Sequence, residues 1–214
     1  MANTYAIREV FATLQGEGAQ AGTPAIFLRF AGCNLGYSVC PWCDTDWVKA
    51  RLVADLEGTL RAVGEAAEAG FGGERPGLLL VATGGEPSLQ LDRPLSDALR
   101  AHGYRIAMES NGSRPIDRSL VDWLTISPKQ PDFVQRSGDE LKLLFSGASA
   151  PGITPDVDAV RALAAGTDFR RYFLQPIDVP ENGGPNYEET IAAVMALGPP
   201  WRLSVQTHKV VGIP

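Results

Sequence analysis

The sequence predicts an α/β fold built on parallel strands. Short β-like runs alternate with helical patterns along the chain, and residues 78–83 (LLLVAT) form the continuous apolar run that is typical of a strand buried on both faces. The chain has 214 residues without a repeat or a low-complexity tract, which favours a single domain over residues 1–214. Parallel strands joined by helices close a barrel or form an open sheet, and function then gathers at their carboxyl ends.

The elements are expected in the following order. A strand at residues 25–30 (AIFLRF) leads into a loop, after which apolar residues at 52, 56, 60, 63 and 67 recur at helical spacing until Gly70 offers a C-cap. After the 78–83 strand, Asp92 is a candidate N-cap for a helix that has Pro94 in its first turn and stops at Gly103. Further strands are expected at 104–110, 123–127, 140–145, 171–176 and 202–207, with helices at 155–165 and 187–197. The segments that follow the strands, where functional residues are expected, are GCN, GGEP, SNG, SPK, QPID and QTHK.

The charge balance and the chain start narrow the class of protein. Lys and Arg number 19 against 25 Asp and Glu, a net charge of −6, and no basic block could neutralise a phosphate backbone. Nucleic acid is therefore not an expected partner. The N-terminal segment lacks a basic region followed by an apolar run, and the longest apolar stretch, residues 78–82, is far shorter than the ~20 residues that a bilayer requires. The sequence thus predicts no membrane association and a cytoplasmic location.

All three cysteines, Cys33, Cys40 and Cys43, lie in one short loop. In a reducing cytosol, clustered thiols indicate a metal site or catalysis rather than a disulfide. A thioredoxin-like pair in CPWC would leave Cys33 unexplained. Structural zinc takes four protein ligands, and neither His102 nor His208 is an obvious fourth. Unliganded core cysteines would be poorly placed in a polar loop.

An iron–sulfur cluster with one open iron explains three cysteines best. Thiolates suit such centres, and four irons held by three cysteines leave one iron for another ligand. Three cysteines after the first strand, Trp42 before the last of them and GGEP after the next strand resemble the radical S-adenosylmethionine (SAM) superfamily. The usual spacing there is C-x3-C-x2-C, whereas this chain has C-x6-C-x2-C. A ligand loop can lengthen while its ends still meet on the cluster.

An ordered set of motifs narrows the resemblance. The set is similar over the whole chain to the 7-carboxy-7-deazaguanine synthase family, and its members are LQGEG (14–18), RFAGCNL (29–35), CDTDW (43–47), TGGEP (83–87), ESNG (109–112), SPK (127–129), QPID (175–178) and QTHKVVGIP (206–214). The resemblance implies a partial, pared-down (β/α)6-type radical SAM barrel and a homodimer. It also implies a lyase of queuosine and 7-deazapurine biosynthesis, which contracts 6-carboxy-5,6,7,8-tetrahydropterin to 7-carboxy-7-deazaguanine with loss of ammonia.

The same resemblance implies the cofactors and the electron donor. The cofactors are a 4Fe-4S cluster, SAM and Mg2+, and the donor is a flavodoxin or a ferredoxin. Another radical SAM enzyme, such as a glycyl-radical activase, would share the cysteines and GGEP but not LQGEG, Arg29 or the tail. A zinc or thiol-redox protein would share CPWC alone.

Cluster and SAM contacts carry over by motif. Cys33, Cys40 and Cys43 would ligate the cluster. Glycines at a strand end let backbone approach the methionyl end of SAM, and the carboxylate after them can accept from its ammonium. The residues implied to contact SAM are Trp42, Cys43, Asp44, Gly85, Glu86, Ser127, Pro128, Lys129, Gln175, Pro176, Ile177 and Asp178.

Substrate and magnesium contacts carry over in the same way. Arg29 interrupts an apolar strand, and a guanidinium grips a carboxylate at two points. Thr45 would bind Mg2+ with Asp44 in support, although DTD could equally be a helix N-cap. The apolar tail over residues 210–214 is expected to be packed, with its final carboxylate at the substrate. The residues implied to hold the pterin are Leu14, Gln15, Gly16, Arg29, Thr83 and Pro214, with Glu17, Glu109 and His208 as further candidates.

Overall fold

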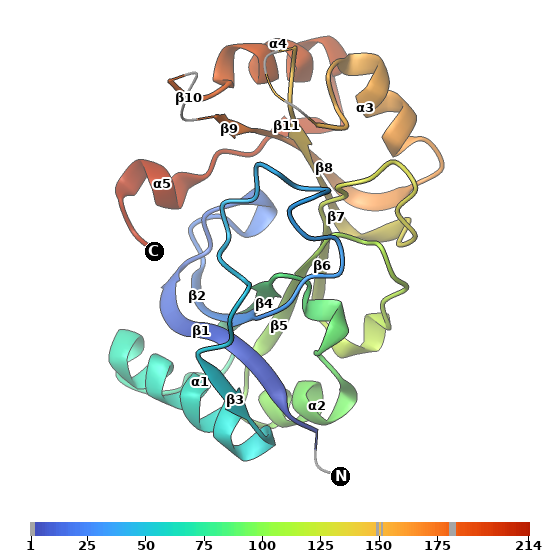
Figure 1. The fold of residues 1–214 in the computed structure, drawn as a ribbon. Coiled ribbons are helices and arrows are strands. Elements are labelled where there is room, and N and C mark those ends of the chain that lie inside the picture. Colours follow the sequence, from blue (N-terminus) through green and yellow to red (C-terminus); the bar gives the residue numbers. More distant parts are fainter. Residues whose placement is uncertain (1–2, 149, 151, 180–182) are drawn as a thin grey trace.

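A nine-stranded sheet, in the order β11-β8-β7-β6-β5-β4-β2-β1-β3, organises the chain (Figure 1). The computed structural model describes residues 3–148, 150, 152–179 and 183–214. Seven consecutive strands of this sheet, from β11 to β2 in the order given, pair with one another in parallel. They are β2 (Pro24–Phe30), β4 (Leu79–Gly84), β5 (Arg105–Ser110), β6 (Trp123–Ile126), β7 (Ser137–Phe145), β8 (Asp168–Pro176) and β11 (Trp201–Leu203).

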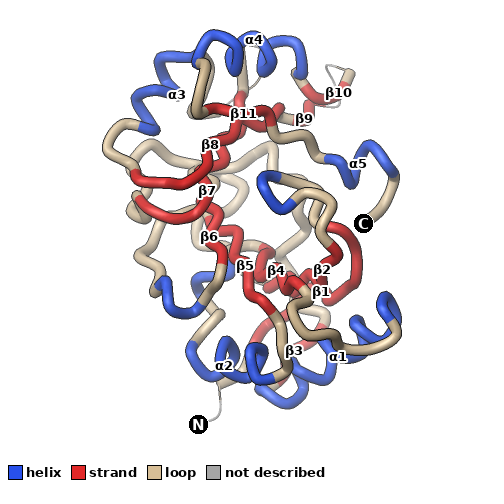
Figure 2. The backbone as a smooth tube through the Cα atoms, turned by 180° about the vertical axis from the view of Figure 1, so that it is seen from behind, coloured by secondary structure: helices blue, strands red, loops and turns tan. Residues whose placement is uncertain are grey.

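Two antiparallel strands extend the sheet at one end. β1 (Tyr5–Leu14) pairs with β2, and β3 (Leu52–Ala54) pairs with the start of β1. Because β3 and β11 remain the two edges, the sheet is open, and it bends into an arc without closing a barrel (Figure 2). The prediction of an α/β fold with parallel strands is confirmed. Of the two arrangements that such strands allow, a closed barrel or an open sheet, the chain forms the open sheet.

Four helices cover the outer side of the arc (Figures 1 and 2). They are α1 (Leu56–Phe71), α2 (Arg93–Ala101), α3 (Val157–Ala164) and α4 (Tyr187–Leu197). Asp55 and Asp92 cap α1 and α2 by accepting from backbone N–H groups at 2.9 and 3.1 Å. None of the helices within the described ranges is long and apolar enough to span a membrane.

Shorter elements complete the inner side and the connections. α5 (Thr207–Val211) lies inside the arc near the end of the chain (Figure 2). Three single-turn helices are η1 (Gly18–Gln20), η2 (Pro87–Leu89) and η3 (Arg118–Leu120). A small hairpin pairs β9 (Asp178–Val179) with β10 (Gly184–Pro185).

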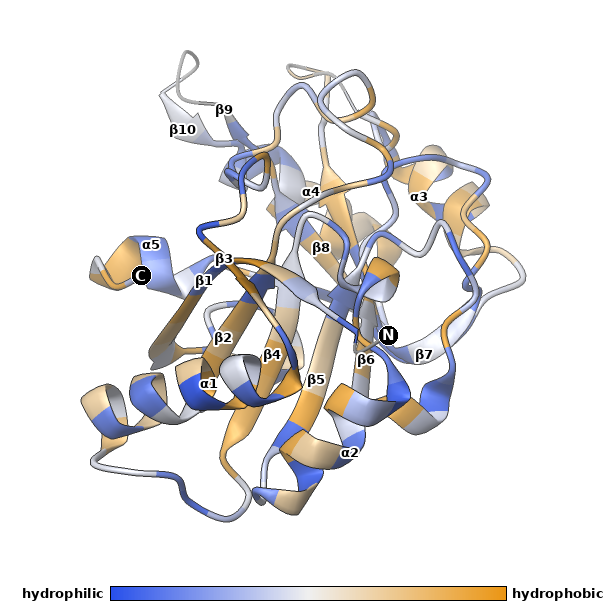
Figure 3. Ribbon diagram, turned by 60° about the horizontal axis from the view of Figure 1, so that its bottom comes forward, coloured by the Kyte–Doolittle hydropathy of each residue, from blue (hydrophilic) through white to orange (hydrophobic). Residues whose placement is uncertain are grey.

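Alternation along the strands separates the core from the inner face. On β4, Leu80 and Ala82 join the main core beneath the helices, whereas Leu79 and Val81 join a small apolar cluster on the inner face. Figure 3 shows apolar colouring along β2 and β5 and mixed colouring on α1 and α2, which turn one face to the sheet. Buried on both faces, β4 therefore reads as the continuous apolar run seen in the sequence.

Two predictions about the elements are wrong, and one strand was not predicted. The helix expected from Leu52 begins at Leu56, because residues 52–54 pair with β1 and Asp55 caps the helix. The strand expected over residues 202–207 ends at Leu203, and α5 starts at Thr207. β1 was not predicted, because its mixed polar and apolar residues are mostly half-buried and give no clear alternation.

The tail was also mispredicted. Val210 and Val211 are 69% and 64% exposed in the single chain, so these two apolar residues of the tail are not packed against the rest of the chain. Their place on a short, solvent-facing helix explains why apolar composition alone did not predict burial.

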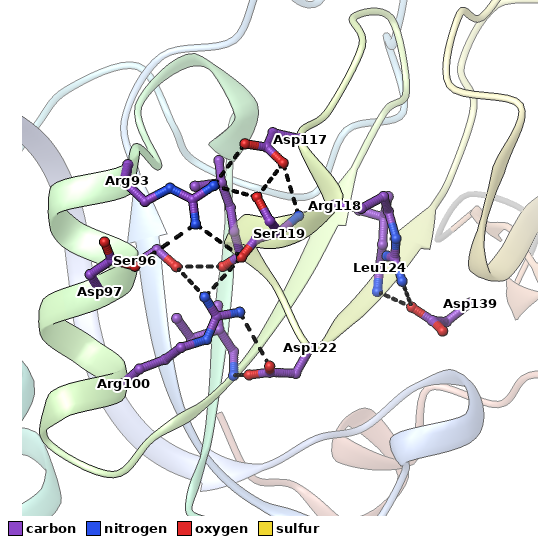
Figure 4. Close-up of polar contacts among 12 residues, drawn as sticks. Arg93, Ser96, Asp97, Arg100, Asp117, Arg118, Ser119, Asp122, Leu124 and Asp139 are labelled. Carbon is purple, nitrogen blue, oxygen red and sulfur yellow. Dashed lines mark hydrogen bonds and ion pairs between the residues drawn. The ribbon is translucent and has the colours of Figure 1, made fainter.

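Polar contacts fasten the amino-terminal edge of the sheet, opposite the strand ends that carry the predicted motifs (Figure 4). Asp139, only 1% exposed, accepts from the backbone N–H of Leu124 at 2.9 Å and pairs with Arg118. Asp122 likewise accepts from the N–H of Ile106 at 2.8 Å. These carboxylates tie together β5, β6 and β7.

Replacing the buried carboxylate should therefore destabilise the fold much more than replacing an exposed one. We expect Asp139→Ala to lower the free energy of unfolding by about 3 kcal/mol, because Arg118 and the Leu124 N–H lose their partner. Asp97→Ala removes only a solvent-exposed pair with Arg93 and should cost less than about 1 kcal/mol. Urea unfolding of the two variants measures both values, and equal midpoints would contradict the structural role of Asp139.

Candidate active site

A cavity of about 880 Å3 lies at the carboxyl edge of the parallel sheet. Every strand-end motif that the sequence analysis singled out contributes residues to its lining. Of the predicted site residues, Glu86 and Pro128 do not line the cavity, and both are buried. The predicted residues that line it are Leu14, Gln15, Gly16, Glu17, Arg29, Cys33, Cys40, Trp42, Cys43, Asp44, Thr45, Thr83, Gly85, Glu109, Ser127, Lys129, Gln175, Pro176, Ile177, Asp178, His208 and Pro214.

Alternation along the strands aims polar side chains into this cavity. On β2, Ile26, Leu28 and Phe30 face the core, which leaves Arg29 on the inner face. Arg29 is opposite Thr83 of β4 in the strand register, and both line the cavity. The inner face is thus apolar at its base and polar at the carboxyl edge.

The cysteine loop is anchored at both ends on β1. The N–H of Ala31 donates to the carbonyl of Ala6, and that of Arg51 to the carbonyl of Ile7, both at 2.8 Å. Since residues 6 and 7 are neighbours, the loop leaves and returns at almost the same point. An ion pair between Arg8 and Asp46 adds a side-chain contact from the same strand.

Turns inside the loop absorb the long spacing between Cys33 and Cys40. The N–H groups of Cys40 and Cys43 donate at 3.1 Å to the carbonyls of Gly36 and Cys40, which closes two successive turns. Tyr37 stacks on Trp47 with ring centroids 4.9 Å apart. The extra residues therefore form local turns within the loop.

The three thiols fit an iron–sulfur cluster by their chemistry. All three are free and line the same cavity, with Cys40 buried and the other two partly exposed. Burial raises the pKa of the Cys40 thiol, and Lys129 opposes that effect. Within the described ranges, no three His, Cys, Asp or Glu side chains are grouped so as to hold a single metal ion. The indole Nε1 of Trp42 is buried without a hydrogen-bond partner among the described residues, at the wall where a ligand is expected.

The Gly-Gly-Glu turn packs against the cysteine loop and against the end of β5. A Cβ on Gly85 would lie 2.0 Å from the carbonyl oxygen of Gly32 and 2.9 Å from the nitrogen of Cys33. Gly85 is therefore packed against the backbone of the cysteine loop. Glu86 is 1% exposed, and its oxygens accept from Ser110 Oγ at 2.7 Å and from the N–H of Asn111 at 2.8 Å. In this structure Glu86 joins the ends of β4 and β5, and its contact with SAM stays a prediction.

Lys209 of α5 bridges two segments of the predicted SAM site. Its Nζ lies 2.9 Å from carboxylate oxygens of both Asp44, in the cysteine loop, and Asp178, after β8. Nearby, Lys129 donates to Ser127 Oγ at 2.6 Å, and Gln175 accepts from Ser204 Oγ at 2.9 Å. α5 thus draws the rim of the cavity together.

Arg29 is held in place for a ligand. Its Nε donates to Glu9 at 2.7 Å, and its guanidinium carbon lies 5.9 Å from the centre of the Phe11 ring. Among the described residues, no hydrogen bond occupies its two terminal nitrogens. Elsewhere in the cavity, Gly16 packs against His208, because a Cβ on Gly16 would lie 2.0 Å from the Nδ1 atom of His208. The carbonyl oxygen of Pro214 accepts from Thr13 Oγ1 at 2.8 Å.

Sequence reasoning missed Lys142, Lys209 and Glu9 among the residues that line the cavity. Lys142 could have been found, because a charged residue inside the apolar run ELKLLF must face either solvent or a polar site. Lys209 lies inside the motif QTHK but was not named as a site residue, and Glu9 gives no signal because it lies in a segment of mixed polar and apolar residues.

Comparisons with known proteins agree with this geometry. No protein-family model matches the chain. A 7-carboxy-7-deazaguanine synthase of Caulobacter vibrioides is 42% identical over 225 residues, which cover 99% of this chain and 100% of the relative. One of Nitratidesulfovibrio vulgaris is 43% identical with the same coverage. Among solved structures, the crystal structure of QueE from Escherichia coli is 28% identical with a TM-score of 0.68, and the match covers 94% of this chain and 93% of that chain.

The open α/β sheet, with three free thiols at its carboxyl edge and a fold similar to that of QueE, defines a radical SAM enzyme. Full-length relatives at more than 40% identity then place the chain more narrowly: it belongs to the 7-carboxy-7-deazaguanine synthase family. The prediction of this family is confirmed, and it is favoured over the activase and zinc or thiol-redox alternatives.

The packing of Gly85 against the cysteine loop can be tested with iron binding. We expect Gly85→Ala to lower the iron bound per chain after anaerobic reconstitution, because its Cβ would displace the backbone at Gly32 and Cys33. Gly64→Ala in α1 is the control, since its nearest neighbour would be a flexible Glu74 oxygen at 3.6 Å. That change should keep full iron content and raise the free energy of unfolding by about 0.5–1 kcal/mol. Full iron content in Gly85→Ala would show that the loop tolerates the shift.

Proposed function

We propose that this chain is a 7-carboxy-7-deazaguanine synthase, which converts 6-carboxy-5,6,7,8-tetrahydropterin to 7-carboxy-7-deazaguanine with loss of ammonia. The observation that carries the proposal is that the three free thiols share one cavity with Arg29 and the polar inner face of the sheet. A cavity of about 880 Å3 is large enough to hold a cofactor and a substrate side by side.

Cys33, Cys40 and Cys43 would hold the 4Fe-4S cluster. The cluster and SAM together would supply a 5′-deoxyadenosyl radical that takes a hydrogen atom from the substrate. The chain's own task is to bind, orient and exclude water. The side chains and backbone that would surround SAM belong to Trp42, Asp44, Gly85, Ser127, Lys129, Gln175, Pro176, Ile177 and Asp178, with Glu86 and Pro128 supporting the wall from behind.

The substrate side would be formed by the inner face and the loop after β1. Arg29, already oriented by Glu9, would grip the pterin carboxylate through its two terminal nitrogens. Thr83 is opposite Arg29 and would contact the same end of the substrate. Leu14, Gln15, Gly16 and Pro214 would surround the ring.

Several finer features belong to the same proposal. Thr45 would contact Mg2+, and the neighbouring Asp44 and Asp46 are engaged by Lys209 and Arg8, which leaves the hydroxyl between two anchored carboxylates. We also propose a homodimer, an electron donor of the flavodoxin or ferredoxin type, a cytoplasmic location and a single domain. One sheet takes in strands from both halves of the chain, which supports the single domain.

The proposed activity is tested by anaerobic reconstitution with iron and sulfide, reduction, and incubation with SAM and 6-carboxy-5,6,7,8-tetrahydropterin. We expect 7-carboxy-7-deazaguanine by mass spectrometry. In Cys40→Ala, both the product and SAM cleavage should be lost, because all three thiolates are needed to leave one defined open iron. Cleavage of SAM by the wild-type protein without product would leave the radical SAM class standing and refute the substrate.

Arg29→Lys should weaken substrate use although it conserves the charge. An ammonium cannot hold Glu9 and also grip a carboxylate at two points, so KM for the pterin should rise by about tenfold or more. The iron content and SAM binding should stay unchanged. Arg105→Lys, at an exposed position of β5, serves as the matched control. An unchanged KM in Arg29→Lys would remove the carboxylate-binding role.

A further inference from the structure

The floor of the cavity holds a buried ammonium group that the proposed function does not yet use. Lys142 of β7 is 3% exposed and lines the cavity. Its Nζ forms an ion pair with Glu17, from the loop after β1, and lies 3.6 Å from an oxygen of Glu109, from β5. One lysine therefore joins two carboxylates that come from separate elements.

Amide side chains fix the same carboxylates from the other side. Gln206 Nε2 donates to Glu17 at 2.7 Å, and Gln15 Nε2 donates to Glu109 at 2.9 Å. The backbone N–H of Glu17 in turn donates to the side-chain oxygen Oε1 of Gln15 at 3.0 Å. Each carboxylate is thus held by one ammonium and one amide, and both still line the cavity.

Burial makes this arrangement depend on Lys142. Burial alone lowers the pKa of Lys142, but Glu109, Glu17 and Glu140 outweigh it, so the pKa is raised and the ammonium stays charged. For Glu17, burial raises the pKa, yet Lys142, Gln206 and His208 bring it down to about 2. The titratable groups that interact with Lys142 or Glu17 from the surrounding elements are Glu109, Glu140, Lys129 and His208, in addition to the pair of Lys142 and Glu17 itself.

We propose that Lys142 is a positioning residue for the substrate, which holds Glu17 and Glu109 as fixed carboxylates so that they accept hydrogen bonds from the ring N–H groups of a reduced pterin. A carboxylate only accepts, and a tetrahydropterin carries N–H donors at ring nitrogens that bear lone pairs in the aromatic pterin. The pair of carboxylates therefore selects the reduced ring over the oxidised one. This inference rests on the proposed function, which supplies the class of substrate.

Selectivity is the expected consequence of such a site. A site built to accept from an N–H group rejects an analogue that lacks the donor, because its buried acceptor is left unpaired against a lone pair. Without the ammonium, Glu17 loses the partner that contributes most to lowering its pKa, so the pKa of Glu17 must rise. Protonated carboxyl groups can donate to the lone pairs of the aromatic ring, so the preference for the reduced ring is lost.

The test measures binding by calorimetry on the anaerobically reconstituted protein with SAM present. The two ligands are 6-carboxy-5,6,7,8-tetrahydropterin and aromatic 6-carboxypterin. We expect Lys142→Met to weaken binding of the reduced ligand by about tenfold or more at neutral pH, while the aromatic ligand loses less or binds more tightly. Relative to wild type, the loss should shrink as the pH is raised, because Glu17 ionises again. Lys49→Met, at an exposed position, is the control.

A second variant keeps the test decisive if Lys142→Met does not fold. Lys142→Met combined with Glu17→Gln removes one charge of each sign, so we expect a urea midpoint near that of wild type but no recovery of selectivity. Wild-type selectivity in either variant would overturn the inference alone. Wild-type protein that binds neither pterin would overturn the proposed substrate, and the inference with it.

Discussion

The alternation of side chains along parallel strands is the constraint on which the rest of the structure depends. On β2, β4, β5 and β7, one set of residues packs beneath the helices and the other set faces the concave side. The same strands therefore build the core and the cavity. A shift of one residue in register would carry Arg29 into the core and Leu28 into the cavity, so the two functions cannot be altered separately.

The buried polar groups that line a cavity need hydrogen-bond or ion-pair partners within the protein before a ligand binds. Here Arg29 is paired with Glu9, Lys142 with Glu17 and Glu109, and Glu86 with two groups at the end of β5. These contacts limit the number of rotamers that each side chain can adopt, and binding then costs less ordering entropy. The cavity is in this sense prepared by its own hydrogen bonds and ion pairs.

Much of the fold and of the site could be predicted from the sequence, and the failures have physical reasons. Continuous apolar runs such as residues 78–83 predicted the central strands, since burial on both faces demands them. β1 was not predicted, because a half-exposed strand of mixed composition shows little alternation of polar and apolar residues. Residues 202–207 were taken as one strand although only Trp201–Leu203 pairs with β8, because a short edge strand gives a weak pattern and its end is decided by tertiary contacts. The strand-end motifs predicted which residues meet, but Lys142 and Lys209 form ion pairs with residues far away in the chain, and no local pattern identifies those partners.

The cysteine loop is anchored on two neighbouring residues of β1, so the length of the loop is independent of the strands that carry it. Because Ala31 and Arg51 bond to Ala6 and Ile7, the length of chain between them places no strain on the sheet. Each doubling of a flexible loop costs only about 0.6 kcal/mol in closure entropy, so insertions there are tolerated. The spacing between Cys33 and Cys40 in the sequence can therefore change without moving the two anchored ends of the loop. A loop of this design behaves as a cassette, which can be lengthened, shortened or exchanged among related chains without rebuilding the strands that carry it.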